Sequence, residues 1–487
     1  MSGNITSVKV RMYNTGSVGD CFLLLFMKGE AISYKMMIDC GGIKTTAAAV
    51  TPCVEDIKTI CNGKLDLLIV THQHEDHISG FNLARNSFTG IEVQEVWMSW
   101  VEDKTDPVAV ALKGKYGKKL KELKKEAESS MAALKKEGVH ASVVKGVKAG
   151  FNARKQSMEQ TMEMIEFEEG NHGKGLAAGR QTNEDAMNFV KNKGKKMQYR
   201  RPGEVLKDLP GAEGIKFYIL GPPRDSDFKF LKIEMDEDDM YKLAAAGKLG
   251  IANSTSGDHI GRSGTSLVKG ESSFGEEFIL KGDHLKAFEK VYNATDNRWR
   301  QIETDWLDTG AETALALTRF INNTSLAMAL EFEGTGKVIL LPGDAQSGNW
   351  ASWHVPELMQ TLKDKGGKNT DELLANTAFY KVGHHISHNG TASKSGLDKI
   401  TGKDVIAFGP LIKDKVPKAW VPDGFPATAL YKVLINKTKG RVVRTDEGWI
   451  TDTTAVDLRN QLSTDAKADL KANYKKGDCF FEYIVKA

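Results

Sequence analysis

Four residues of the metal-ligand type stand within six positions in the segment His72-Gln-His74-Glu-Asp76-His77. Two histidines that are two positions apart at the end of an extended strand point to the same side, so His72 and His74 can bind one metal ion. Asp76 and His77 then turn toward a neighbouring position, where we expect a second cation. The segment directly follows the apolar run Leu65–Thr71, which is too short for a typical helix and predicts a buried strand. The pattern predicts a metal centre at the end of that strand.

A site for two metals needs further ligands, and two later strand ends supply them. One apolar strand leads into Pro-Gly-Asp344, whose carboxylate is suited to bridging two cations. The alternative role for Asp344 is to cap the helix that follows. Another strand, Phe379–Val382, leads into Gly-His384-His385-Ile-Ser-His388. We favour His384 as the metal ligand because it follows the strand directly, and we expect His385 and His388 to support the ligands or to transfer protons.

A centre of this kind would catalyse hydrolysis. Two divalent cations about 3.5–4 Å apart polarise a substrate oxygen and hold a bridging hydroxide that is nucleophilic near neutral pH. Asp76 is expected to bind the second metal and to orient that hydroxide, while His388 or His385 would protonate the leaving group. Imidazole and carboxylate ligands without a thiolate favour zinc and tolerate manganese or iron.

The order of these motifs resembles that of the metallo-β-lactamase superfamily, which has HxHxDH after a strand, a later Gly-Asp and a later Gly-His. The resemblance implies an α/β fold, namely a four-layer αββα sandwich with a dinuclear metal site. It also implies that Asp39, at the end of the strand-like YKMMID, supports the site rather than binding metal.

Several blocks resemble one branch of that superfamily, the hydrolase domain of bacterial competence DNA-internalisation proteins, here as a soluble stand-alone relative. These blocks are GDCFLLLF (19–26), KFYILGPP (216–223), NNTSLAMAL (322–330), VILLPGDA (338–345), YKVGHHIS (380–387) and residues 425–450. As in that branch, Asn322 and Asn323 stand where the superfamily often has a third histidine for the first metal, and Asn323 is expected to support the site. Ile386 and Phe425 depart from the branch, which has glycine and a loop histidine there. The resemblance implies phosphodiesterase or nuclease activity.

The strand-rich blocks are separated by two segments of different composition. Residues 1–100 are expected to form the first half of the core, 101–214 a Lys-rich and mainly helical insert, 215–223 a core strand, 224–317 a second insert, 318–455 the second half of the core, and 456–487 a C-terminal tail. The inserts have no counterpart in the family and are expected to decide the substrate.

The first insert is basic. Residues 102–201 contain 22 Lys or Arg against 14 Asp or Glu. Phosphate affinity comes largely from such side chains, so a nucleic acid or another phosphodiester is the expected substrate. The side chains expected to contact it are Lys191, Lys193, Lys195, Lys196, Arg200 and Arg201. The alternative for this insert is a solvated helical arm.

The composition excludes other classes of protein. The chain has 487 residues, 40% of them hydrophobic, and a net charge of +3, which excludes a wholly polybasic nucleic-acid binder. The N-terminal segment lacks a signal-peptide core and no apolar run is long enough to span a membrane, so we expect a cytoplasmic protein without a membrane partner. Five cysteines without a CxxC pair make a disulfide framework improbable.

Two other functions are compatible with the motifs. The same site could hydrolyse a lactone, a lactam or another ester, for which a basic insert would have no use. Alternatively, the metals could be structural and the chain could bind a protein partner in a larger system. The sequence leaves the oligomeric state open.

Overall fold

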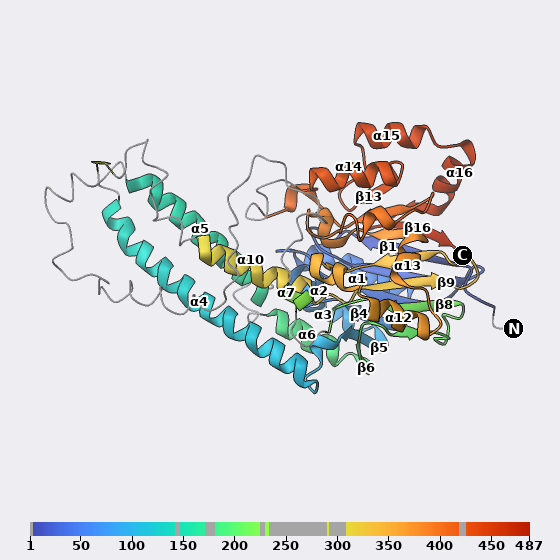
Figure 1. The fold of residues 1–487 in the computed structure, drawn as a ribbon, viewed down its shortest axis with the longest axis horizontal. Coiled ribbons are helices and arrows are strands. Elements are labelled where there is room, and N and C mark those ends of the chain that lie inside the picture. The colour runs from blue at the N-terminus through green and yellow to red at the C-terminus, as the bar shows by residue number, and fades with distance from the viewer. Residues whose placement is uncertain are drawn as a thin grey trace. The chain divides into compact units, whose positions relative to one another are not determined.

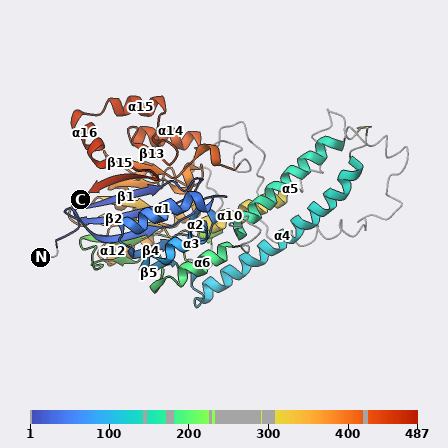
Figure 2. The same cartoon turned by 180° about the vertical axis from the view of Figure 1, so that it is seen from behind.

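The computed structural model describes residues 3–141, 147–170, 181–224, 229–232, 290–291, 308–417 and 425–487. The chain divides into two compact units. The core unit comprises Met1–Lys113, Phe167–Gly247 and Arg319–Ala487, and the second unit comprises Gly114–Glu166 and Lys248–Thr318. Every predicted site residue belongs to the core unit, which also contains both sheets (Figures 1 and 2).

The first sheet has eight strands. They are β1 Ser7–Tyr13, β2 Phe22–Lys28, β3 Ala31–Ile38, β4 Lys64–Val70, β5 Glu92–Ser99, β6 Gly194–Arg200, β15 Tyr474–Lys476 and β16 Phe480–Lys486. Their order across the sheet is β15-β16-β1-β2-β3-β4-β5-β6. The pairs from β3 to β6 are parallel, whereas the other pairs are antiparallel. The carboxyl ends of β3 and β4 therefore share one edge of the sheet.

The second sheet also has eight strands. They are β7 Val205–Leu206, β8 Ile215–Ile219, β9 Met328–Phe332, β10 Val338–Leu341, β11 Thr377–Lys381, β12 Ile406–Gly409, β13 Val442–Arg444 and β14 Gly448–Trp449. The sheet order is β14-β13-β12-β11-β10-β9-β8-β7. The pairs from β10 to β13 are parallel, so the carboxyl ends of β10 and β11 also lie at a common edge.

Alternate residues of the strands form a core between the sheets. Successive side chains of a strand point to opposite faces, so Phe22, Leu24 and Phe26 of β2 all enter one buried apolar cluster. This cluster also contains residues of the second sheet. The ring of Phe217 on β8 stacks on Phe26 with ring centroids 6.0 Å apart and meets Trp97 of β5 edge-on at 5.8 Å. The two sheets thus bury their apolar faces against each other.

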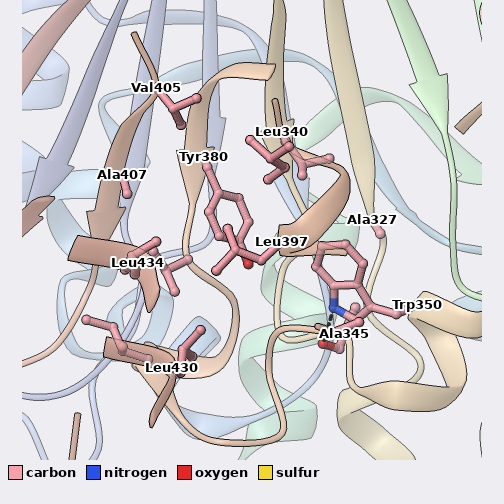
Figure 3. Close-up of a cluster of buried hydrophobic side chains, with 14 of the residues drawn as sticks. Ala327, Leu340, Ala345, Trp350, Tyr380, Leu397, Val405, Ala407, Leu430 and Leu434 are labelled. Atoms are coloured by element: carbon pink, nitrogen blue, oxygen red, sulfur yellow. Dashed lines mark hydrogen bonds between the residues drawn. The ribbon is translucent and has the colours of Figure 1, made fainter. Parts of the chain in front are cut away.

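Helices pack against both sheets through two further apolar clusters. On the first sheet these helices are α1 Ala47–Ile60, α2 Glu75–Leu83, α3 Arg85–Thr89 and α6 Asn183–Lys191. On the second sheet they are α11 Ser347–Ser352, α12 Pro356–Asp364, α13 Thr370–Ala375 and α14 Thr428–Lys437. Figure 3 shows part of the second cluster, in which Leu430 and Leu434 of α14 lie near Leu397 and Tyr380.

The other α-helices of the described residues are α4 Pro107–Ala141, α5 Val147–Glu169, α7 Lys229–Lys232, α10 Asp308–Asn322, α15 Thr453–Asn460 and α16 Thr464–Asn473. Helices α4 and α5 fall within residues 101–214. No helix among the described residues is long and apolar enough to cross a membrane.

The mixed α/β class predicted from the sequence is confirmed. Two segments assigned outside the core contribute strands to the first sheet: β6 falls within the predicted first insert, and β15 and β16 fall within the predicted tail. The tail strand β16 pairs with β1 along its whole length. Most of the predicted second insert, 224–317, lies outside the described residues.

Substituting Trp350 with alanine should destabilise the core unit strongly. Its side chain is fully buried, its ring lies 4.1 Å from that of Trp353, and its Nε1–H donates to the carbonyl of Ala345 at 3.1 Å (Figure 3). Removing a buried indole costs about 3–5 kcal/mol. Urea unfolding should show a loss of that size, whereas Glu357→Ala on the exposed face of α12 should change the unfolding free energy by less than about 0.5 kcal/mol. A loss below about 1 kcal/mol for Trp350→Ala would contradict the packing described here.

Candidate metal centre

The candidate site lies where parallel strands of both sheets end. Asp39 follows β3, the HxHxDH segment follows β4, Asp344 lies three residues after β10, and His385 lies four residues after β11. Open α/β sheets place their binding sites at the carboxyl ends of strands. The two packed sheets therefore bring together residues that are far apart in the sequence.

Four buried side chains form the centre of this site. Asp20, His77, Asp344 and His385 each offer one ligand atom, and these atoms lie within 4.8 Å of one another. Nε2 of His77 and Nε2 of His385 lie 3.0 and 3.4 Å from Oδ2 of Asp344. Oδ2 of Asp76 lies 2.8 Å from Nε2 of His385. We call these five residues the carboxylate–histidine cluster.

Several atoms of the cluster face one another without a hydrogen bond. Within the described part of the chain, Asp20 Oδ1 and Asp76 Oδ1 are buried and have no hydrogen-bond partner, and His77 Nε2 and Asp344 Oδ2, although 3.0 Å apart, do not meet hydrogen-bond geometry. Buried polar atoms without partners are rare because desolvation then goes uncompensated. A divalent cation would satisfy these atoms, and a set of imidazole nitrogens and carboxylate oxygens suits zinc, manganese or iron. The residues present therefore fit a metal ion.

The raised pKa values of two histidines reflect how negative the surroundings of the cluster are. Burial would lower the pKa of His77, but the carboxylates of Asp344, Asp20, Asp76 and Asp39 outweigh burial and hold that pKa well above its ordinary value. The pKa of His385 is raised in the same way, against its burial, chiefly by Asp344 and Asp76. A field that attracts protons to these imidazoles also attracts a metal cation.

Lys381 places a buried positive charge beside the cluster. Its ammonium donates to the carbonyl of Gly343 at 2.8 Å and to Oδ1 of Asp344 at 3.0 Å, and it also pairs with Asp20. Burial opposes its charge, yet the carboxylates of Asp20 and Asp344 raise the pKa of Lys381 above its ordinary value. Because Oδ1 of Asp344 is held by the ammonium, Oδ2 is left facing the histidines.

The rings of His72 and His74 contact each other, while their predicted role as ligands of one metal stays a prediction. Nε2 of His72 lies 3.0 Å from Nδ1 of His74, a hydrogen-bond contact. Both nitrogens are near enough to bind one zinc ion at about 2.0–2.1 Å after a small movement of the rings. Burial, with the neighbouring His77 and His74, holds the pKa of His72 well below its ordinary value. His72 is therefore neutral near pH 7, which is the form that binds metal.

Asp39 contacts the site as a supporting residue would. Its Oδ1 accepts the Thr71 N–H at 2.8 Å, and its Oδ2 accepts the Thr71 hydroxyl at 2.7 Å and lies 2.7 Å from Nδ1 of His77. A proton on that Nδ1 leaves Nε2 of His77 facing Asp344. The supporting role itself stays a prediction.

The structure places the imidazole of His385, and not that of His384, in the cluster. His384, His385 and Ile386 all have left-handed backbone conformations, with φ of 45°, 52° and 64°. This turn directs His384 toward Asn389 Oδ1 at 2.8 Å, while its N–H donates to Asp344 Oδ1 at 3.1 Å. The prediction that His384 is a metal ligand thus lacks geometric support here and stays a prediction.

His388 lies outside the cluster and is half-buried. Burial, followed by the neighbouring charges of His384 and Arg319, lowers the pKa of His388 to about 4. The imidazole is therefore neutral near pH 7 and has no acidic proton to donate, and a pKa of about 4 also makes it a weak base. The predicted role of His388 in proton transfer stays a prediction.

Asn323 binds the turn after Asp344, and Asp344 does not cap the helix that follows. Oδ1 of Asn323 accepts the N–H groups of Gln346 at 3.2 Å and Asn349 at 3.0 Å, so it holds the turn that follows Asp344. The N-cap of helix α11 is Gln346, which leaves Asp344 free of the alternative capping role.

The predicted basic segment lies largely in salt bridges. Lys191 pairs with Glu102, Lys195 with Glu92, Lys196 and Arg200 with Glu95, and Arg201 with Asp106, while Lys193 donates to the carbonyl of Thr89. In the parallel register, Lys196 aligns with Glu95 and through it with Leu67 of β4. Lys196 therefore lies near the middle of the strands and away from their carboxyl ends, where the site is. The structure does not bring Lys196 to the cluster.

Three charged residues of the site were missed by reasoning from sequence. Asp20 stands in the block GDCFLLLF but received no role, and Lys381 is a lone charge in the apolar strand TAFYK. A lysine in a buried strand is rare unless it is paired, which is a usable signal. Glu168, whose Oε1 lies 3.0 Å from His74 Nε2, carries no such signal because it ends a long polar helix.

Comparisons with known proteins do not assign the chain to a family. No protein-family model matches it, and no curated protein matches it significantly.

Gly41→Ala should disrupt the site through a backbone clash. A Cβ at Gly41 would lie 2.4 Å from the carbonyl carbon of Asp76, so the loop after β3 could no longer approach Asp76 and His77. We expect the variant to bind zinc at least tenfold more weakly than the wild type in a competition titration with a chromophoric chelator. Gly334→Ala, where no atom lies within 4 Å of the added Cβ, is the matched control. Equal zinc affinity of both variants would show that the close approach is not required.

The low pKa of His388 predicts how stability depends on pH. A folded pKa of about 4 lies below the ordinary unfolded value of about 6.5, so the unfolded chain binds more protons between these limits. The free energy of unfolding should therefore fall as the pH drops from 6.5 toward 4. In urea unfolding of metal-free protein, the free energy of unfolding should fall between pH 7 and pH 4.5 in both proteins. The fall should be about 1–3 kcal/mol smaller for His388→Gln than for the wild type. An identical loss in both proteins would contradict this assignment.

Proposed function

We propose that this protein is a metal-dependent hydrolase that cleaves phosphodiesters, as a nuclease or as a phosphodiesterase of smaller substrates. We further propose that the two sheets and their helices form the four-layer αββα sandwich of the metallo-β-lactamase superfamily. Packing of the sheets through one apolar cluster, with helices on each through another, supports this fold. The metals would be two divalent cations, zinc or alternatively manganese or iron.

One observation carries the proposal: the buried carboxylate–histidine cluster contains ligand atoms that have no hydrogen-bond partner among the described residues. A structural network of the same residues would be expected to satisfy these atoms internally. The predicted pair His72 and His74 belongs to the same HxHxDH segment as Asp76 and His77 of the cluster, and its facing nitrogens are 3.0 Å apart. The arrangement therefore supports two adjacent cation positions, one at the histidine pair and one at the cluster.

Bound divalent cations would supply a Lewis acid for a phosphoryl oxygen and lower the pKa of bound water. The residues of the chain prepare for this chemistry by fixing donor atoms. Asp39 and the carbonyl of Pro410 lie 2.7 and 2.8 Å from Nδ1 of His77 and His385. These contacts direct Nε2 of His77 toward Asp344 and Nε2 of His385 toward Asp76 and Asp344. Lys381 holds Asp20 and Asp344 in place.

A second candidate function is hydrolysis of a neutral ester, lactone or lactam. The salt bridges along Lys191–Arg201 favour it, because those cations already have partners within the protein. The same metal positions would serve either reaction, so the substrate has to be determined by comparing substrates directly.

Asp344→Asn should abolish turnover, and circular dichroism and urea unfolding of the variant would show whether the folded structure is retained despite the lost partner of Lys381. Its carboxylate is fully buried and lies between both histidines of the cluster, so the neutral amide would weaken metal binding and lower kcat/KM by at least 100-fold. The assay would use zinc- or manganese-loaded protein with labelled single- and double-stranded DNA, a bis-aryl phosphodiester and an aryl lactone. The control is Asp414→Asn, an exposed aspartate.

Cleavage of phosphodiesters that is lost in Asp344→Asn and kept in Asp414→Asn would support the proposal. Turnover of the lactone alone would favour the second candidate. Phosphodiester cleavage that survives Asp344→Asn would place the reaction elsewhere in the molecule.

A further inference from the structure

The second histidine of the HxHxDH segment contacts a carboxylate from a distant helix end. Nε2 of His74 lies 3.0 Å from Oε1 of Glu168, near the end of α5, and both side chains are almost completely buried. The ring of Phe167 packs on the His74 ring at a centroid distance of 4.7 Å. Asn183 donates to the carbonyls of Phe167 and Glu168 at 3.0 and 3.1 Å, which fixes the end of α5 at this position.

The contact follows a rule shared by the other histidines of the site. His77 and His385 each place Nδ1 against an oxygen, from Asp39 and Pro410, and each directs Nε2 toward Asp344. His72 likewise has Nδ1 near the Thr71 hydroxyl at 3.1 Å and Nε2 toward His74. In metal sites the second ring nitrogen of a ligating histidine usually donates to such an oxygen, which fixes the tautomer and raises the basicity of the ligand.

We propose that Glu168 is a positioning residue that keeps the proton of His74 on Nε2, so that Nδ1 faces Nε2 of His72 as a metal ligand. This inference rests on the proposed metal-binding function. A metal ion at His72 and His74 would depend strongly on how these two rings are oriented, because the third histidine that the superfamily often supplies is absent. Asn323, at the place of the frequent third histidine, is engaged with Gln346 and Asn349.

The position of Glu168 makes it a partner of His74 rather than a ligand beside it. Its carboxylate lies at the ring nitrogen opposite to the one that faces His72. A metal ion between His72 and His74 would therefore be separated from Glu168 by the imidazole ring. Helix α5, which belongs to the predicted insert, thus contributes a residue to the chemistry of the core.

The test uses Glu168→Ala and Glu168→Gln in the full chain, with Glu166→Gln, an exposed glutamate of the same helix, as the control. Zinc affinity would be measured by competition with a chelator. Glu168→Ala should weaken zinc binding by about 10–100-fold, the usual effect of removing such a partner. Glu168→Gln should bind with intermediate affinity because its amide oxygen can still accept the proton, and Glu166→Gln should match the wild type.

A second readout is the ¹⁵N spectrum of metal-free protein labelled at histidine. The wild type should show His74 protonated on Nε2, and Glu168→Ala should shift His74 toward the Nδ1–H form. Unchanged zinc affinity, or an unchanged His74 tautomer in Glu168→Ala, would overturn the role of Glu168. Failure of the wild type to bind zinc would instead refute the proposed function, while the tautomer would still test the contact.

Discussion

The site depends on the need to neutralise buried carboxylates. Asp20, Asp39, Asp76 and Asp344 are all buried within one small region, and Lys381 supplies one fixed positive charge among them. Without a cation, the remaining charge is balanced by protons on His77 and His385, whose pKa values are raised. Leaving one buried charge without its partner costs about 3–5 kcal/mol. A metal cation satisfies the same requirement and releases both imidazoles to act as ligands.

The fold meets this requirement by joining the ends of strands from two sheets. Strands β3 and β4 contribute Asp39 and the HxHxDH segment, while β10 and β11 lead to Asp344 and His385. The apolar core between the sheets fixes these ends relative to each other, and Gly41 lets one loop approach the backbone of Asp76 closely. Three successive left-handed residues after β11 then turn His385 inward; such conformations cost energy and are concentrated at functional sites.

Local pattern predicted the parts of the structure that depend on neighbours in sequence. Apolar runs predicted strands that the structure contains, namely β3, β4, β8, β10 and β11. The spacing of ligand-type residues predicted a metal site at the HxHxDH segment and Asp344, which stays a prediction. The choice between His384 and His385 depended on backbone angles that residue type does not reveal. The basic composition of 194–200 concealed strand β6, whose lysines and arginine pair with Glu92 and Glu95 of β5. Glu168 reaches His74 through tertiary packing, for which local sequence holds no signal.

The most direct test of the central claim is anomalous diffraction from crystals grown with zinc or manganese, with data collected on both sides of the metal absorption edge. The account predicts an anomalous peak within bonding distance of His77 Nε2, His385 Nε2 and a carboxylate oxygen of Asp344. A second peak is expected between His72 and His74. The account would be contradicted if crystals grown with either metal showed no peak at the carboxylate–histidine cluster. The charge of the cluster would then be balanced by Lys381 and the protonated histidines alone.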